Sequence, residues 1–159
     1  MRTVVQRVSS AGVTLPRSGD ISGQITTGLA VLVGLQQGDS PSQLQWMADK
    51  ITNLRIFPDH EGKMNLDVSQ VPGGAILLVP NFTVGCEVGK GRRPSFDRAM
   101  SPADAKPMFH AFVDTMRATG IPIQTGVFGA EMRVTLCNDG PVTFVIQTPD
   151  SSTGARQNA

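Results

Sequence analysis

Apolar residues along the chain gather in short runs of strand length, separated by polar stretches that are rich in glycine and proline. These runs predict strands at residues 3–8, 12–15, 21–25, 29–35 and 75–79, and on either side of residues 138–141. The run LAVLVGL at 29–35 carries no charged or hydrogen-bonding side chain, which indicates a buried strand. Residues 12–15 are expected to pair with residues 3–8 after a bend at Ser-Ser-Ala.

Two segments carry the sequence signature of a helix start, a serine followed by a proline. Ser40-Pro41 would supply the N-cap and the first helical position, and Ser101-Pro102 repeats this pattern with Asp104 close behind. Apolar residues follow at helical spacing and predict one buried face for each helix: Leu44, Met47, Ala48, Ile51 and Leu54 in the first, and Met108, Phe109, Phe112, Val113 and Met116 in the second. Pro107 removes a backbone hydrogen bond early in the second helix, so we expect a kink or a late start.

The order of these elements predicts an α+β fold with two main helices and mixed, mostly antiparallel sheets. A chain of 159 residues suits one domain, which we assign to residues 1–148. Residues 149–159 are polar and are expected to form a disordered tail. The sequence contains no Gly-x-Gly-x-x-Gly pattern and no Walker-type loop, so it does not indicate a common nucleotide-binding fold.

The charge balance limits the kind of partner. With a net charge of +1, no broad cationic face is expected, and a nucleic acid would be held locally. The opening MRTVVQRV alternates and carries two arginines, unlike a signal peptide, and no apolar run approaches membrane-spanning length. We therefore expect a cytoplasmic protein that does not act on a membrane.

Side chains suited to conventional hydrolysis are scarce, because a nucleophile needs a base beside it. His60 falls in a turn at residues 58–62, and His110 falls on the second helix, where a surface or half-buried position is expected. A dyad of Cys86 with a histidine stays possible, although nothing in the spacing marks it. Cys137 ends a strand and is expected in the core. No metal-ligand spacing is visible, so we expect neither a metal nor a cofactor.

Unusual backbone composition stands out instead. Residues 80–83 (PNFT) follow a strand directly, residues 90–96 (KGRRPSF) combine three cations with an aromatic ring, and residues 126–132 (GVFGAEM) are glycine-rich. Asn138-Asp139-Gly140-Pro141 is dense in turn formers. A hairpin loop is the simplest interpretation of this tetrapeptide, and stiff backbone that touches a ligand is the alternative.

The motifs VVQRV, GL-VLVG, K-I-NLRIF, GRRPSF, TG-FGAEM and NDGPVT occur here in the order in which D-aminoacyl-tRNA deacylases carry them. The resemblance covers nearly the whole chain, and the last three motifs together are highly specific. It implies a small α+β layered sandwich that forms a homodimer with active sites at the subunit interface. It also implies chiral proofreading: hydrolysis of the ester between a D-amino acid and the 3′ end of tRNA, and clearance of glycine mischarged on tRNA.

The same resemblance assigns expected roles to individual residues. Gly140-Pro141 would be the family's Gly-cisPro motif, which reaches into the partner's pocket, receives the substrate's ammonium group and excludes any L side chain. Arg7 would brace this loop. The backbone N–H groups of Phe82 and Thr83 would stabilise the oxyanion, while the terminal 2′-hydroxyl of the tRNA helps to activate water.

Further contacts are expected around the reacting ester. Met132 would lie near the terminal adenosine, and Pro80 and Asn81 would line the pocket. Lys90, Arg92 and Arg93 would contact phosphates of the acceptor end, with a solvated basic loop as the alternative interpretation. These assignments place the substrate in one pocket that is framed by loops.

Pro80-Asn81 departs from the family's usual Ser-Gln, which removes one N–H and one hydroxyl and shortens the amide side chain. Three alternatives therefore stay open. The chain could be a relaxed relative that clears glycine or small L-amino acids from tRNA, a non-catalytic RNA-binding module, or a hydrolase that depends on Cys86 or Thr83.

Overall fold

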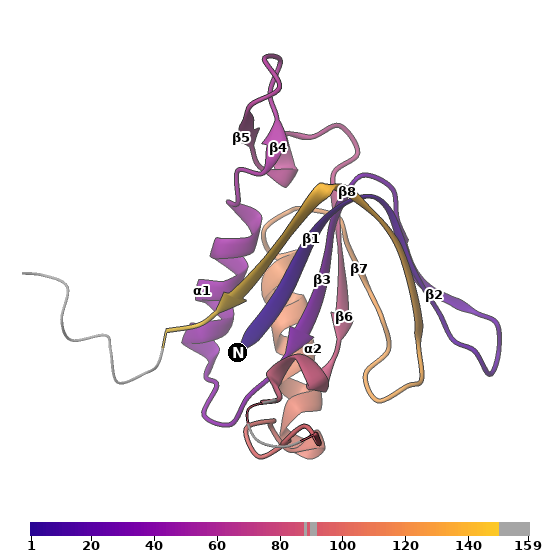
Figure 1. Ribbon diagram of the computed structural model, residues 1–159, viewed down its shortest axis with the longest axis vertical. Coiled ribbons are helices and arrows are strands. Elements are labelled where there is room, and N and C mark those ends of the chain that lie inside the picture. The colour runs from indigo at the N-terminus through magenta and orange to yellow at the C-terminus, as the bar shows by residue number, and fades with distance from the viewer. Residues whose placement is uncertain (88, 90–91, 150–159) are drawn as a thin grey trace, which may run out of the picture.

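The computed structural model describes residues 1–87, 89 and 92–149 (Figure 1). The expected basic residue Lys90 and residues 150–159 of the expected tail lie outside this described part. Within it, no helix is both long and apolar enough to cross a membrane.

One mixed sheet forms the body of the molecule. Its strands follow the order β2-β1-β3-β6-β7, and β8 pairs with the other edge of β1. The pairs of β1 with β2, β3 and β8 are antiparallel, whereas β3–β6 and β6–β7 are parallel. Because β2 also contacts β7, the sheet curves into a nearly closed barrel (Figure 1). The bounds are Arg2–Thr14 (β1), Ile21–Ile25 (β2), Gly28–Gly34 (β3), Ala75–Pro80 (β6), Ile123–Thr125 (β7) and Arg133–Gln147 (β8).

β1 is a single long strand, which corrects the expectation that residues 12–15 pair with residues 3–8. Residues 2–8 of β1 pair with β3, and residues 11–14 pair with β2. Both halves also pair with β8, so each already has neighbours on its two edges. The expected bend at Ser-Ser-Ala is a register shift in the β1–β8 pairing, at the point where β1 passes from β3 to β2.

The two helices begin where the sequence predicts. The helix α1 (Pro41–Thr52) has Ser40 as N-cap in a capping box with Gln43, and α2 (Pro102–Arg117) has Ser101 as N-cap. The late start expected from Pro107 is wrong, because α2 continues through this residue. Because proline has no N–H, the Ala103 carbonyl lacks its usual helical donor. Pro107 and Ala103 are both exposed, so water can donate to that carbonyl instead.

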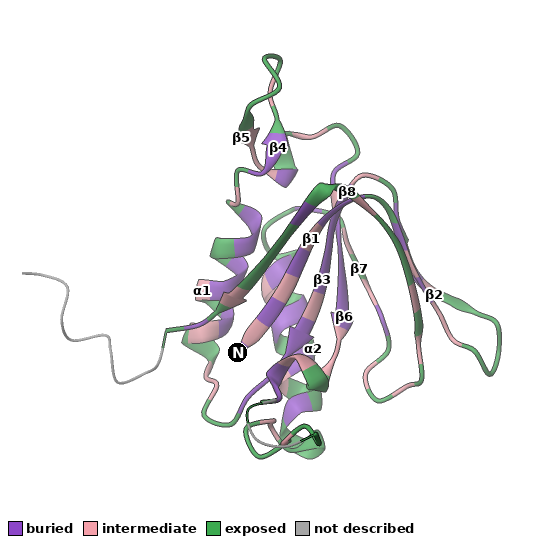
Figure 2. Cartoon of the chain, in the orientation of Figure 1, coloured by how far each residue is buried: buried purple, intermediate pink, exposed green. Residues whose placement is uncertain are grey.

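Two apolar clusters hold the sheet in place. The larger lies between the sheet and both helices and includes the fully buried Val31, Met47, Ile51, Phe109 and Phe112. The smaller fills the opposite, inner face of the curved sheet, and Val8, Val13, Leu77 and Val79 belong to it. Burial of each such Val, Leu or Phe side chain contributes about 1.5–3 kcal/mol. Figure 2 accordingly shows β3 and β6 largely buried.

β8 differs from the other long strands because most of its residues are exposed (Figure 2). It pairs only with β1, and no element covers its outer side within the described residues. Cys137 therefore lies exposed, which corrects the expectation that it belongs to the core. The strand also continues through residues 138–141, so this tetrapeptide is not a hairpin loop. A separate hairpin of β4 (Phe57–Pro58) and β5 (Met64–Leu66) contains the expected turn at 58–62.

Candidate functional site

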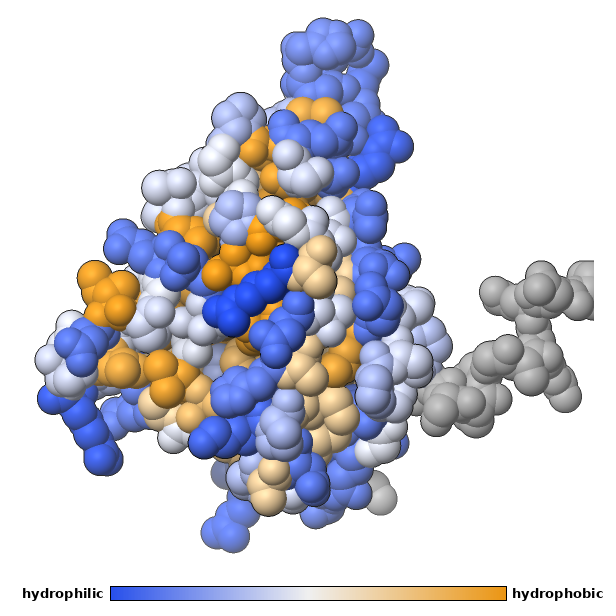
Figure 3. Space-filling model, turned by 180° about the vertical axis from the view of Figure 1, so that it is seen from behind, coloured by the Kyte–Doolittle hydropathy of each residue, from blue (hydrophilic) through white to orange (hydrophobic). Residues whose placement is uncertain are grey.

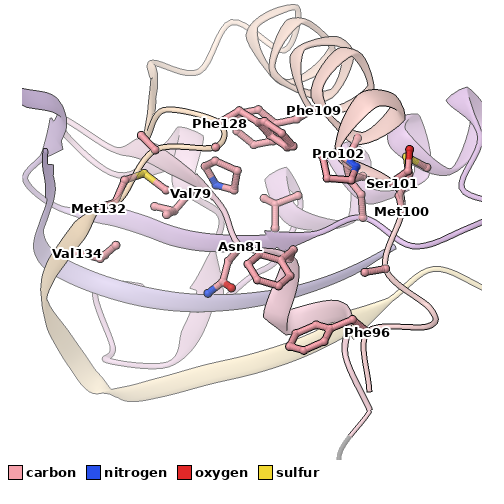
Figure 4. A pocket seen from close by; sticks show the side chains of 18 residues that line it. Val79, Asn81, Phe96, Met100, Ser101, Pro102, Phe109, Phe128, Met132 and Val134 are labelled. Carbon is pink, nitrogen blue, oxygen red and sulfur yellow. The ribbon is translucent and has the colours of Figure 1, made fainter. Parts of the chain in front are cut away.

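A cavity of about 680 Å³ opens beyond the end of β6, between the start of α2, residues 128–132 and the short 3-10 helix η2 (Phe82–Gly85). Its walls are mostly apolar. Figure 4 shows Phe109 and Phe128 on one side of the cavity, with Met132 and Val134 on another. Four of the residues predicted from the sequence line it together: Pro80, Asn81, Phe82 and Met132.

The glycine-rich approach to β8 positions Met132. The Sδ atom of Met132 accepts a hydrogen bond from the Val127 N–H at 3.3 Å. It also lies so close to Gly126 that a Cβ atom there would come within 2.7 Å of it. Glycine at 126 thus makes room for the thioether, which explains why this motif needs a residue without a side chain.

The end of β6 passes into η2 through Asn81. The Asn81 N–H donates to the Val33 carbonyl at 2.8 Å, so the residue stays fixed to the sheet. Its side-chain oxygen Oδ1 accepts from the Thr83 N–H at 3.1 Å and from the Thr83 hydroxyl at 2.5 Å. Asn81 is therefore the cap of η2.

This cap decides which backbone donors are free. The N–H of Thr83 is engaged by Asn81, whereas within the described part of the chain the N–H of Phe82 has no acceptor. Thr83 does not line the cavity, and its hydroxyl donates to an amide oxygen rather than to a base. Among the described residues, the Phe82 N–H is therefore left without a protein acceptor, whereas both the N–H and the hydroxyl of Thr83 are engaged by Asn81.

Neither cysteine nor histidine supplies an evident nucleophile or base. Burial raises the pKa of the Cys86 thiol, and its Sγ atom points to the Phe82 carbonyl at 3.5 Å. His60 and His110 are both exposed and lie on other elements. Within residues 1–87, 89 and 92–149, no group of three or more His, Cys, Asp and Glu side chains could hold a metal ion.

The tetrapeptide at 138–141 forms a bulge in β8 that is held by β1. Gln6 pairs with Thr143 and Val8 with Asn138, so residues 139–142 stand opposite Arg7 alone. We call residues 139–142 the β8 bulge. The Gly140–Pro141 peptide bond in it is cis, and Gly140 has a φ of 135°.

Two polar side chains fix the β8 bulge. The Arg7 guanidinium donates to the Asp139 carbonyl at 3.1 Å and forms an ion pair with the Asp139 carboxylate at the same distance. It also donates to the Ile56 carbonyl at 2.6 Å, and the Arg7 residue is only 8% exposed. The Asn138 side-chain amide donates to the carbonyls of Arg7 and Val142 at 3.0 and 3.1 Å.

The β8 bulge does not reach the cavity of its own chain. None of its residues lines that cavity. In the sheet, Pro80 is in register with Val33 and Val33 with Thr3, whereas the bulge stands opposite Arg7. Thr3 and Arg7 are four residues apart along β1, so the end of β6 at Pro80 and the bulge are about 13 Å apart at the usual rise of a strand. Within one chain, the predicted site residues therefore form two separate groups. One group consists of Gly140, Pro141 and Arg7, and the other of Pro80, Asn81, Phe82 and Met132.

Some cavity residues could not be found from the sequence pattern. Phe109 lies on the predicted inner face of α2, where an apolar residue at helical spacing is ordinarily core. Phe96 belongs to the basic stretch but had no role assigned, and its ring contacts that of Phe82 with centroids 5.4 Å apart. Phe128, in the glycine-rich stretch 126–132, likewise belongs to a stretch of unusual composition but had no role assigned.

Comparisons with known proteins agree on one family. The family model described as D-Tyr-tRNA(Tyr) deacylase matches residues 4–147. A relative from Geobacter metallireducens named D-aminoacyl-tRNA deacylase is 49% identical over 97% of this chain and 100% of its own. A protein of the same name from Thermomicrobium roseum is 45% identical over 98% of this chain and 99% of its own.

Solved structures agree with the fold. One described as a c-Myc DNA unwinding element binding protein is 38% identical, covers 94% of this chain and 100% of its own, and has a TM-score of 0.85. Another, described as a probable eukaryotic D-amino acid tRNA deacylase, has a TM-score of 0.75 over 91% of this chain and 97% of its own. At 17% identity, it supports the α+β fold alone. On the full-length family match and the close relatives, the chain belongs to the D-Tyr-tRNA(Tyr) deacylase family and is a deacylase.

Proposed function

We propose that this enzyme hydrolyses the ester bond between a D-amino acid and the 3′-terminal adenosine of tRNA, and that it also clears glycine mischarged on tRNA. The observation that supports this most is the Phe82 N–H, which has no acceptor among the described residues, on a residue that lines an apolar cavity in a member of a deacylase family. The enzyme would act in the cytoplasm, where charged tRNA is used.

The cavity suits the terminal nucleoside. An adenine ring is flat and largely apolar on its faces, and the walls around Phe128 and Met132 offer it aromatic and thioether contacts. With the nucleoside there, the ester would lie toward η2. The terminal 2′-hydroxyl of the tRNA would then stand beside the reacting carbonyl and help to activate the attacking water.

Catalysis would depend on backbone hydrogen bonds rather than on a side-chain nucleophile. An aminoacyl ester is already activated, and one well-placed donor stabilises a developing oxyanion by about 3 kcal/mol. Phe82 offers such a donor directly. The second expected donor, the Thr83 N–H, becomes available only when the Asn81 side chain turns away from it.

We further propose that two copies join along β8, so that the β8 bulge of each enters the cavity of the other. β8 is an edge strand, and its large apolar residues Leu136, Phe144 and Val145 are 37%, 41% and 67% exposed. An exposed edge with apolar side chains is a surface on which another chain can pair. Figure 3 shows the face behind the view of Figure 1, where apolar residues gather in patches among polar ones. The Gly140 and Pro141 carbonyls of the partner would receive the ammonium group, and backbone there would exclude an L side chain.

The substrate assay compares hydrolysis of D-Tyr-tRNA, Gly-tRNA and L-Ala-tRNA by purified enzyme. We expect turnover of the first two and none of the third. Cleavage of L-Ala-tRNA without cleavage of D-Tyr-tRNA would instead identify a relaxed relative, and binding without any turnover would identify a non-catalytic RNA-binding module. Thr83→Val and Cys86→Ala should each keep kcat within about threefold; a loss of a thousandfold in either would point to a side-chain nucleophile.

A complementation assay tests the shared site. Ala130→Trp should fill the cavity of one chain, and Gly140→Ala should displace the β8 bulge of another, so each variant alone should be inactive. Mixed dimers should regain activity, since one of their sites combines an intact cavity with an intact bulge. A mixture that stays inactive, or an active monomer by light scattering, would contradict the proposal.

A further inference from the structure

Two phenylalanine rings lie exposed at the mouth of the cavity. Phe82 comes from η2 and is 63% exposed, while Phe96 comes from the loop before α2 and is 47% exposed. Their centroids lie 5.4 Å apart with the planes tilted by 40°. We call these two residues the aromatic pair. Both line the cavity, and Figure 4 shows Phe96 at its edge, away from Phe109 and Phe128.

Residues 95–100, which include Phe96, are joined to neighbouring segments by hydrogen bonds and an ion pair. Backbone hydrogen bonds join Glu87 and Ser95 in both directions, at 3.2 and 2.9 Å. The Arg98 guanidinium forms an ion pair with Glu87 at 3.1 Å. On the other side, the Met100 N–H donates to the Leu35 carbonyl of the segment after β3 at 3.1 Å. The ring of Phe96 is thus presented by an anchored backbone, although its own side chain is half exposed.

Two positively charged residues lie close in sequence to Phe96 of the aromatic pair. Arg92 and Arg93 are both exposed and precede Phe96 by only three or four residues. Among the residues that the structure describes, neither forms an ion pair. Exposed aromatic rings beside cations are the combination that holds single-stranded nucleic acid, because bases stack on the rings while phosphates meet the charges.

We propose that the aromatic pair is a stacking platform for the unpaired nucleotide directly before the terminal adenosine, with its phosphates facing Arg92 and Arg93. This inference rests on the proposed function. When the terminal nucleoside fills the cavity, the RNA strand must leave through the mouth, where Phe82 and Phe96 lie. Stacking accepts any base, since every base has a flat face, so the platform holds the strand without selecting its sequence.

The exposed apolar residues of β8 do not share this explanation. They lie on an edge strand and do not line the cavity, whereas the aromatic pair lies on two loops at its mouth. A protein partner would leave the neighbouring arginines unexplained, and RNA accounts for rings and charges together.

The kinetic test uses three substrates of increasing length: D-tyrosyl-adenosine, the D-tyrosyl ester of the trinucleotide CCA, and D-Tyr-tRNA. Phe96→Ala should lower kcat/KM on the CCA ester and on D-Tyr-tRNA by about tenfold, which corresponds to the loss of one stacked base. On D-tyrosyl-adenosine, kcat/KM should change by no more than about twofold. Phe96→Tyr should retain the activity on all three. Ile21→Ala is the control, because it removes an apolar residue that is 64% exposed, against 47% for Phe96, and that does not line the cavity.

Two kinetic outcomes would overturn the inference. An equal loss on all three substrates by Phe96→Ala would mean that the ring serves the fold or the terminal nucleoside. No loss on any of them would mean that no platform exists. If the wild-type enzyme cleaves none of the three, the proposed function fails instead, and a binding measurement then decides on the platform.

The binding measurement uses uncharged CCA with 2-aminopurine in place of the second cytosine. Stacking should quench its fluorescence when wild-type enzyme or Phe96→Tyr is added, and Phe96→Ala should abolish the quenching. Arg93→Ala should weaken binding and lower the slope of log affinity against log salt by about one. Quenching that survives in Phe96→Ala, or a salt slope that Arg93→Ala leaves unchanged, would contradict the proposed platform. Circular dichroism confirms that each variant is folded.

Discussion

Residues 58–62 and residues 138–141 both combine proline, aspartate and glycine, yet only the first segment reverses the chain. Residues 58–62 connect the antiparallel strands β4 and β5. Residues 138–141 lie within β8, and both halves of that strand run antiparallel to the same β1. Composition alone therefore does not decide whether turn-forming residues reverse the chain.

The first segment is held by its own neighbours. The Asp59 carboxylate accepts hydrogen bonds from the backbone N–H groups of Glu61 and Lys63 at 2.8 and 3.0 Å, and from the Asn65 side chain at 2.5 Å. All three donors lie within six residues of Asp59. The hydrogen bonds of the Asp59 carboxylate thus all come from within the hairpin itself.

The second segment is held by a distant strand. Arg7, which lies 132 positions before Asp139, donates a hydrogen bond to the Asp139 carbonyl and forms an ion pair with the Asp139 carboxylate. Turn-forming residues therefore mark where the backbone leaves regular geometry. Whether the chain reverses depends on which strands the flanking segments pair with.

The largest effect is expected when the distant support is removed. Arg7→Met should lower the free energy of unfolding by about 3 kcal/mol, because the buried Ile56 carbonyl and the bulge lose their donor. Hydrolysis of D-Tyr-tRNA should fall on the order of a hundredfold as the bulge is displaced. Urea denaturation and a deacylation assay measure the two effects. Arg2→Met, which removes an arginine bonded to Gln147 at the sheet edge, should cost less than about 0.5 kcal/mol.

A smaller difference should separate the glycines of the two segments. Gly140 and Gly62 both have positive φ, but a Cβ at Gly140 would lie 2.6 Å from Val142 Cγ2, whereas nothing lies within 4 Å of one at Gly62. Gly140→Ala should therefore cost about 3 kcal/mol in unfolding free energy and Gly62→Ala about 1 kcal/mol. Equal costs would mean that the bulge is no more tightly packed than an open turn.

Asn138, the residue just before the β8 bulge, should matter less than Arg7. Asn138→Ala removes two donated hydrogen bonds from a half-buried side chain, and we expect a loss of about 1.5 kcal/mol in unfolding free energy. Asn65→Ala, which removes the side-chain donor to Asp59, is the corresponding change in the local turn. If Asn65→Ala proved the more costly of the two, the contrast between local and distant support would be wrong.

The smallest effect concerns pH. The hydrogen bond from Asn65, together with those from backbone N–H groups and against a smaller desolvation effect, lowers the pKa of Asp59 below its ordinary value of 3.8. The unfolded chain therefore binds this proton more tightly, and the stabilisation by Asp59 is present above about pH 4 and lost as the pH falls through the lowered pKa. Thermal unfolding of wild type and Asp59→Ala at pH 7 to 3 should show a small difference that shrinks below pH 3.8. A difference that grows on acidification would contradict this sign.

Local signals in the sequence predicted most of the fold. Ser40-Pro41 and Ser101-Pro102 begin helices, and the runs at 29–35 and 75–79 are buried strands, because caps and apolar periodicity act within a few residues. Strand partners depend on distant residues, which is why the expected pairing of 12–15 with 3–8 and the expected hairpin at 138–141 were wrong. Cys137 was misplaced for the same reason, since an edge strand is recognised only once its neighbours are known.

The candidate site was predictable only in part. The resemblance to a family predicted one pocket around Pro80, Asn81, Phe82 and Met132, and in the structure these residues line one cavity. Nothing in the sequence showed that the Asn81 side chain occupies the Thr83 N–H, because that depends on a torsion angle of one short side chain. Phe96 and Phe109 were missed because aromatic residues in a loop or on a helix face carry no mark of the cavity that they share.

The pairing of β1 with β8 also affects how the chain is made. Arg2 lies opposite Gln147 and Thr14 opposite Arg133. The strand β1 is therefore synthesised long before its partner β8, and it stays unpaired along that edge until β8 has been made. At ordinary rates of translation the interval is roughly ten seconds, during which one edge of β1 keeps its N–H and C=O groups open to any passing strand. Nascent chains of this protein should therefore need chaperones most in the interval before β8 leaves the ribosome, and pairing with β8 then closes the exposed edge.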